Sequence, residues 1–175
     1  MTLKPTLVLL LICSLCFQSC WYTGGNDDDF GPIESQYNYQ PIIMQRDAFE
    51  ATTTFQNSPE PILNSGKIYV KDQFIFIHEK DKGFHVINNT DPSNPQNVAF
   101  INVLGSSDLA IKGSTLYVNN ATDLVALSID AQAGTMEITK RVADAFPQLL
   151  SPQGFSYYDL QDNEVIVGWS ILENN

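Results

Sequence analysis

His78 and His85 are the side chains of this 175-residue chain best suited to bind a metal ion, because imidazole nitrogens are common ligands of zinc. Glu79 or Asp81 could add a carboxylate ligand through the turn between the two histidines. The spacing alone does not bring three ligands to one point, as a zinc site requires. We therefore predict no metal site and interpret both histidines as hydrogen-bonded residues of β-strands, with a metal pair as the alternative.

Acidic residues at predicted turns offer a second kind of chemistry, which is hydrolysis assisted by carboxylates or by a metal. Asp81, Asp91 and Asp123 are the residues on which such an enzyme would depend. Aspartate at a turn also caps backbone N–H groups, which explains these positions without catalysis. The chain contains no Gly-x-Ser-x-Gly, phosphate-binding loop or His-Glu-x-x-His motif. We predict no catalytic residue and no cofactor, and we keep a hydrolase as the alternative.

All three cysteines of the chain lie within its first 20 residues, so no disulfide or cysteine nucleophile is expected in the domain that follows. A short positive start and the apolar run Leu7 to Phe17 are typical of a signal peptide over residues 1–19, and the run is too short to span a membrane. The sequence Phe17-Gln18-Ser19-Cys20 resembles the lipobox of bacterial lipoproteins. This resemblance implies that Cys20 becomes an N-terminus carrying acyl chains such as palmitate. A plain secretory signal that is cleaved elsewhere would also export the domain.

Residues 20–36 are predicted to be an acidic flexible tether, because they contain no apolar period that a core could use. The run Asp27-Asp28-Asp29 resembles the export signal by which some Gram-negative lipoproteins reach the outer face of the outer membrane, and a solvated spacer is the alternative. The whole chain carries 9 Lys and Arg against 20 Asp and Glu, a net charge of -11. This balance argues against nucleic-acid binding, which needs clustered basic residues.

The remaining chain divides into a lead-in over residues 37–63 and a β domain over residues 64–175. The lead-in predicts a strand from Tyr37 to Met44 and a short helix from Arg46 to about Thr53. After Pro61 the apolar residues alternate and β-branched and aromatic residues dominate, which indicates strands.

An internal repeat of about 40 residues appears when Lys67–Asn88 is laid over Asp108–Ser128. Ile68 and Val70 then match Leu109 and Ile111, the segment 76–78 matches 117–119, and the segment 84–87 matches 124–127. Each copy predicts four strands, at about 67–70, 73–78, 83–88 and 97–103 in the first and about 108–111, 114–119, 123–129 and 135–142 in the second. This is the period of a propeller blade. The predicted fold is mainly β, with about two four-stranded antiparallel propeller-like blades, an incomplete propeller, and a short N-terminal strand and helix lead-in.

The segment Gly83-Phe84-His85-Val86-Ile87, followed by Ser93-Asn94-Pro95, resembles the LVIVD-repeat family over about residues 64–142. The lead-in and the tail from Phe146 to Trp169 are similar to a Gram-negative surface lipoprotein subgroup of that family. The resemblance implies a β-propeller-type fold and no established activity. Two blades cannot close a ring, which usually needs at least four. We expect the strand Glu164 to Ile171 to cap a blade or begin a third, and we expect self-association through the open sheet edge.

Four aromatic residues form the candidate interaction surface, because aromatic faces give contact area to a sugar or a partner protein. They are Tyr117, Tyr157, Tyr158 and Trp169. Core packing explains the same residues and is the simpler interpretation. The predicted function is a lipid-anchored, surface-exposed binding or scaffold module on the outer membrane, held to the membrane by its lipid, with an unknown protein or glycan partner. A hydrolase, or a truncated structural relative that is stable only as an oligomer, are the alternatives.

Overall fold

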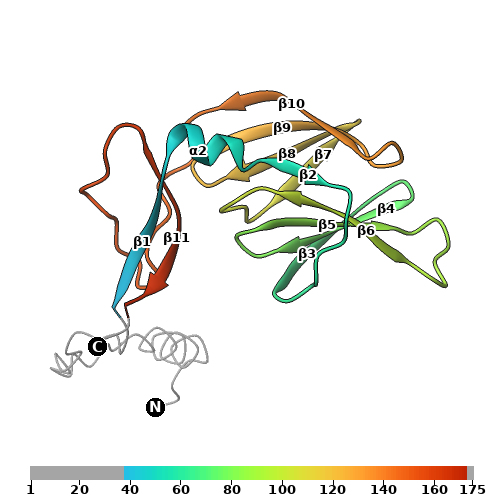
Figure 1. Cartoon of the computed structure of the whole chain (residues 1–175), viewed down its shortest axis with the longest axis horizontal. Helices are drawn as coiled ribbons and strands as arrows, with labels where there is room; N and C mark the ends of the chain where they lie inside the picture. Colours follow the sequence, from blue (N-terminus) through green and yellow to red (C-terminus); the bar gives the residue numbers. More distant parts are fainter. Residues whose placement is uncertain (1–37, 173–175) are drawn as a thin grey trace, which may run out of the picture. The chain divides into compact units, whose positions relative to one another are not determined.

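The computed structural model describes residues 38–172, and these form a mainly β structure of antiparallel sheets (Figure 1). The elements in chain order are β1 (Tyr39–Gln45), α2 (Arg46–Ala51), β2 (Thr54–Gln56), β3 (Ser65–Lys71), β4 (Phe74–Glu79), β5 (Gly83–Asn88), β6 (Gln96–Asn102), β7 (Leu109–Lys112), β8 (Thr115–Asn120), β9 (Asp123–Asp130), β10 (Thr135–Val142) and β11 (Glu164–Ile171). The prediction of a mainly β fold is confirmed. No sheet in this part of the chain closes on itself.

Two larger sheets contain the predicted strands in simple meander order. The five-stranded sheet has the order β2-β6-β5-β4-β3, and the four-stranded sheet has the order β10-β9-β8-β7. The β3–β4 and β7–β8 hairpins both close through two-residue turns. In these turns Asp72 and Gly113 adopt left-handed backbone conformations, with φ of 53° and 59°.

The lead-in differs from its prediction at its C-terminal end. The helix ends at Ala51 rather than at about Thr53, and Thr54–Gln56 pairs with β6 as a fifth strand. Thr52 to Thr54 is a run of β-branched residues, which lose side-chain freedom in a helix and fit a strand better. The lead-in therefore contributes directly to the first large sheet.

The last strand does not cap either of the larger sheets. β11 lies in a third, two-stranded sheet, in which it pairs antiparallel with β1 from Tyr39 opposite Ile171 to Gln45 opposite Glu164, a partner that the sequence did not predict. Val165 and Val167 on β11 pack against Phe49 of α2 in a small second core. The two ends of the described chain are thus joined in one ribbon, beside α2 (Figure 1).

The main core lies between the two larger sheets, which pack face to face. We call the two sheet faces that line this core the inner faces. Phe76, Phe84 and Val86 come from the five-stranded sheet, and Leu116, Val118 and other residues come from the four-stranded sheet. Phe84, Val86 and Val118 are at most 1% exposed. Since each strand alternates its side chains, every second residue points away from this core, onto an outer face.

Where two positions match in the sequence repeat, one faces this core and the other faces away from it. Ile68 and Val70 are on the outer face of the five-stranded sheet, 64% and 67% exposed, whereas the matching Leu109 is 5% exposed in the core. Conversely, Phe76 is 3% exposed in the core, and the matching Tyr117 is 37% exposed on the outer face of the four-stranded sheet. The two sheets are therefore stacked in the same direction, with the front of one on the back of the next.

Candidate functional site

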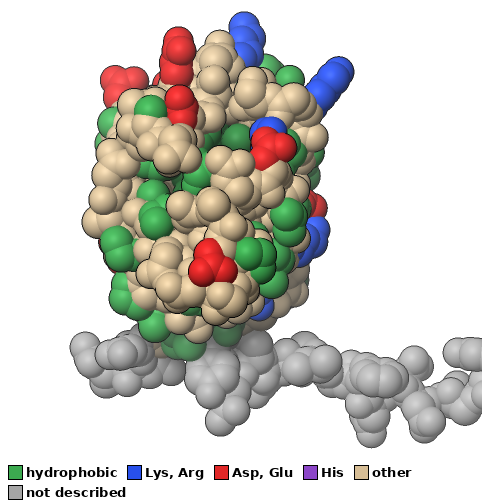
Figure 2. Space-filling model, turned by 90° about the vertical axis from the view of Figure 1, so that its right-hand side faces the viewer, with side chains coloured by type: hydrophobic (Ala, Val, Ile, Leu, Met, Phe, Trp, Pro, Cys, Tyr) green, Lys and Arg blue, Asp and Glu red, His purple; other side chains and the backbone are tan. Residues whose placement is uncertain are grey.

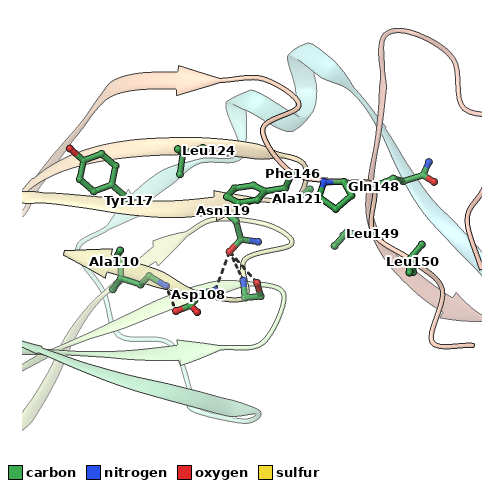
Figure 3. A pocket seen from close by; sticks show the side chains of 13 residues that line it. Asp108, Ala110, Tyr117, Asn119, Ala121, Leu124, Phe146, Gln148, Leu149 and Leu150 are labelled. Carbon is green, nitrogen blue, oxygen red and sulfur yellow. Dashed lines mark hydrogen bonds between the residues drawn. The ribbon is translucent and has the colours of Figure 1, made fainter. Parts of the chain in front are cut away.

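A groove of about 640 Å³ lies on the outer face of the four-stranded sheet (Figure 3). Its floor is formed by Ala110 on β7, Tyr117 on β8 and Leu124 on β9. Ala110 lies directly opposite Tyr117 in the strand register, so both side chains point to the same face. The lining of the groove is largely apolar, and Tyr117 presents its ring to solvent.

The wall of the groove is the segment 146–150, which follows β10 and contributes Phe146, Leu149 and Leu150. The backbone N–H of Phe146 donates to the carbonyl of Thr122 at 2.8 Å. The indole N–H of Trp169 donates to the carbonyl of Leu149 at 3.3 Å. Hydrogen bonds with two other segments, one donated by the wall and one accepted by it, therefore hold this wall in place.

Asn119 fixes the polar end of the groove. Its side-chain oxygen accepts the backbone N–H groups of Ser107 and Asp108 at 2.9 and 3.0 Å (Figure 3). Its amide nitrogen donates to the carbonyl of Gly105 at 3.0 Å. These bonds hold the chain that enters β7. The Asn119 amide is thus committed to backbone groups rather than to a ligand.

Asp108 supplies a negative charge at the same end. Hydrogen bonds from the Lys67 ammonium and the Tyr69 hydroxyl lower the pKa of Asp108 to about 2. Burial and the bond to Asp108 raise the pKa of Tyr69 to about 12. At neutral pH Asp108 is therefore ionised, and its charge is paired with the Lys67 ammonium and bound by the Tyr69 hydroxyl, both on β3.

The four aromatic residues predicted as one interaction surface are not brought together. Tyr117 lines the groove, whereas Tyr157 and Trp169 line a separate hollow of about 570 Å³ with Tyr39 and others beside the β1–β11 ribbon. Tyr158 is 90% exposed and lines neither hollow. Sequence reasoning found Tyr117 but missed Leu149 and Leu150, because the segment after β10 has no period that marks it.

The two histidines point to opposite faces of the five-stranded sheet and share no ligand position. His78 is on the inner face, where its Nε2 lies 2.8 Å from the carbonyl oxygen of Ser106. His85 is completely buried on the other face, and its Nε2 lies 3.1 Å from Oε2 of Glu79. Each histidine is thus a hydrogen-bonded strand residue, as interpreted from the sequence. Among residues 38–172 there is no group of three metal-binding side chains.

Glu79 is buried beneath the segment that joins β2 to β3. It accepts the backbone N–H groups of Leu63 and Asn64 at 3.1 and 2.6 Å, in addition to the contact with His85. Burial alone would raise the pKa of Glu79, but these hydrogen bonds outweigh it and the pKa lies below its usual value. The carboxylate therefore anchors the crossing segment to β4.

The three aspartates of the hydrolase hypothesis have separate structural contacts. The Asp123 carboxylate is fully buried, 2.7 Å from Nη1 of Arg46 and 2.8 Å from Nη1 of Arg141. Asp91 accepts the backbone N–H and hydroxyl of Ser93, and Asp81 adopts a left-handed turn conformation. Asp81 and Asp91 also flank opposite ends of β5. The structure does not bring these carboxylates to one site.

Cys20 and the acidic tether lie outside the described residues. Within the described chain, no helix has the length and apolar character needed to cross a membrane. Lys and Arg are dispersed singly, rather than gathered, on the face that Figure 2 shows. Comparisons of the chain with protein-family models, with curated proteins and with solved structures found no match.

Proposed function

We propose that this chain is a lipid-anchored, surface-exposed binding or scaffold module without catalytic activity, and that the groove on the outer face of the four-stranded sheet is its binding surface. The observation that carries this proposal is the groove itself. It is open, apolar along its floor and wall, and fixed by hydrogen bonds at both sides. A preformed apolar groove binds a partner without first paying the entropy of ordering its own loops.

The groove favours a protein segment over a glycan. Its lining contains Tyr117, Leu124, Phe146 and other apolar side chains, while the Asn119 amide is already occupied by backbone groups. A sugar needs many free hydrogen-bonding groups, and apolar side chains of a protein do not.

The proposed position of the module is the outer membrane, facing the cell surface. The support for this is the lipobox-like sequence that ends at Cys20 and the acidic residues 27–29 after it. After removal of the signal peptide, an acylated Cys20 and a flexible tether would hold the domain near the membrane without inserting it. We also propose membership of the LVIVD-repeat family and a propeller-like arrangement of the two larger sheets, which the shared meander order and same-direction stacking support.

Site-specific photo-crosslinking in intact cells tests the binding surface. A photoreactive phenylalanine analogue would replace Tyr117 in the full-length lipoprotein, and in a control it would replace Ile138 on β10. Tyr117 and Ile138 are almost equally exposed, at 37% and 38%, but Ile138 does not line the groove. We expect a discrete protein adduct at position 117 and none at position 138. The absence of an adduct at 117, or equal adducts at both positions, would contradict the proposal.

A further inference from the structure

The outer face of the five-stranded sheet carries an apolar patch on β3 and β4. Ile68 pairs with Ile77 across the two strands, and Val70 pairs with Ile75, so the four side chains lie on one face. Ile68 and Val70 are 64% and 67% exposed, which is unusual for β-branched residues of a sheet. We call this set of four residues the β3–β4 patch.

The residues that match this patch in the second half of the chain are core residues. Leu109 and Ile111 match Ile68 and Val70, and Leu116 and Val118 occupy the positions of Ile75 and Ile77. Leu109, Leu116 and Val118 are at most 5% exposed. They pack on the inner face of the five-stranded sheet. The packing inside the chain therefore shows which kind of surface covers residues at these positions of the repeat: the inner face of the preceding sheet.

The inner face of the five-stranded sheet, which covers these core residues, also corresponds in the repeat to another surface, and that surface is the groove. The inner-face residues Tyr69, Phe76 and Phe84 correspond to Ala110, Tyr117 and Leu124, which form the groove floor. Within residues 38–172, no further sheet packs over the β3–β4 patch or over the groove, and the two lie at opposite ends of the stack of the two larger sheets.

We propose that the groove receives the β3–β4 patch of a second copy of this chain, so that copies associate head to tail by repeating the sheet-to-sheet packing inside each chain. This inference rests on the proposed function, because it names the partner of the same groove. The two surfaces are different, so the contact is heterologous and not a symmetric pairing of like edges. Two copies would supply four of the larger sheets, and a propeller ring usually needs at least four blades.

One charged residue lies beside each of the two surfaces, and the two residues have opposite signs. Lys67 precedes Ile68 of the patch, and Asp108 lies at the end of the groove. Within one chain these two side chains form an ion pair, although both remain more than half exposed. Because Lys67 matches Asp108 in the repeat, packing of the same kind between copies would bring Lys67 of one copy near Asp108 of the next, where each residue already has its partner in its own chain.

Co-capture of two differently tagged full-length chains tests this arrangement. Val70→Glu places a charge in the patch, and Ala110→Glu places one in the groove, both at exposed positions where the fold should tolerate it. The wild-type chain should capture its tagged copy, and each variant should lose capture of itself by at least about tenfold, because an unpaired carboxylate would be buried at the contact. Ile138→Glu, outside both surfaces, is the matched control and should keep full capture. Far-ultraviolet circular dichroism and melting temperature check that all three variants are folded.

The decisive arm mixes the two variants. Val70→Glu retains an intact groove and Ala110→Glu retains an intact patch, so a mixture should restore capture through one good contact per pair. Failure of wild-type chains to capture one another, self-capture by either variant, or no restoration in the mixture would overturn the inference. A photo-adduct at position 117 with a different protein would overturn it as well while leaving the proposed function intact, whereas no adduct at all would contradict both.

Discussion

Two contacts in this molecule differ in their chemistry: the contact between the two larger sheets, and the contact between α2 and the four-stranded sheet. The junction between the larger sheets is apolar, with Phe84 and Val86 fully buried in it. The junction between α2 and the four-stranded sheet is ionic, with Asp123 held by Arg46 and Arg141 while both guanidinium groups lie over the Phe49 ring at 5.7 and 5.5 Å. The difference indicates that the sheets are joined by non-directional packing, and that the lead-in is fixed in one orientation by directional bonds.

The largest expected effect is at the apolar junction. Phe84→Ala should lower the free energy of unfolding by about 3–5 kcal/mol, because the ring is completely buried and its loss leaves a cavity between the sheets. Urea unfolding followed by tryptophan fluorescence measures this change. A loss below about 1 kcal/mol would mean that the two sheets are not joined by a close-packed core.

The ionic junction should be slightly less costly to break. Asp123→Ala removes the only carboxylate that contacts both Arg46 and Arg141 among the described ion pairs, and leaves two partly buried cations without it. We expect a loss of about 2–4 kcal/mol by urea unfolding. Phe84→Ala should respond little to added salt. If the Asp123→Ala loss vanished even at low salt, the cluster would not fix the lead-in.

Phe49→Leu sharpens the comparison, because Phe49 belongs to both kinds of contact. It is fully buried against Val165, and its ring also faces the two guanidinium groups. Leucine keeps most of the apolar volume and removes the ring face, so the expected loss is about 2 kcal/mol. Combining this change with Asp123→Ala in a double-mutant cycle should give a total below the sum of the two losses. Strict additivity would show that the ring and the ion pairs act separately.

The smallest effect should be the pH response of Asp108 at the groove end. Its pKa is lowered to about 2 in the folded chain from 3.8, so its stabilising contribution is present above about pH 4 and is lost as pH falls toward 2. Because both Asp108 and Lys67 are more than half exposed, the contribution should stay below about 1 kcal/mol. Asp108→Asn should flatten this part of a stability-against-pH curve. An unchanged slope between pH 4 and 2 would contradict the assignment.

The sequence was most informative where contacts are local. Alternation of apolar residues and the internal repeat predicted the strands of the two larger sheets to within about two residues, because hairpins pair neighbours in the chain. The pairing of β1 with β11 and the attachment of β2 to β6 were missed, since they join distant segments. Register between such segments depends on the finished core rather than on local pattern.

The candidate site likewise contains residues that could be predicted from local sequence and residues that could not. Tyr117 could be singled out as an aromatic residue on a strand, and its outward direction follows from the alternation of β8. The wall of the groove could not be predicted, because Leu149 and Leu150 lie in an irregular segment held by Trp169 and by backbone bonds. The ionic junction was equally hidden, since Arg46 and Asp123 are 77 residues apart.

The most direct test of the account is the identity of the protein captured by a photoreactive residue at position 117 of the full-length chain. Mass spectrometry of the adduct should identify peptides from β3 and β4 of a second copy, joined to β8. If the photoreactive residue gave no adduct at position 117, just as at the control position 138, the groove would not be the surface that binds the partner.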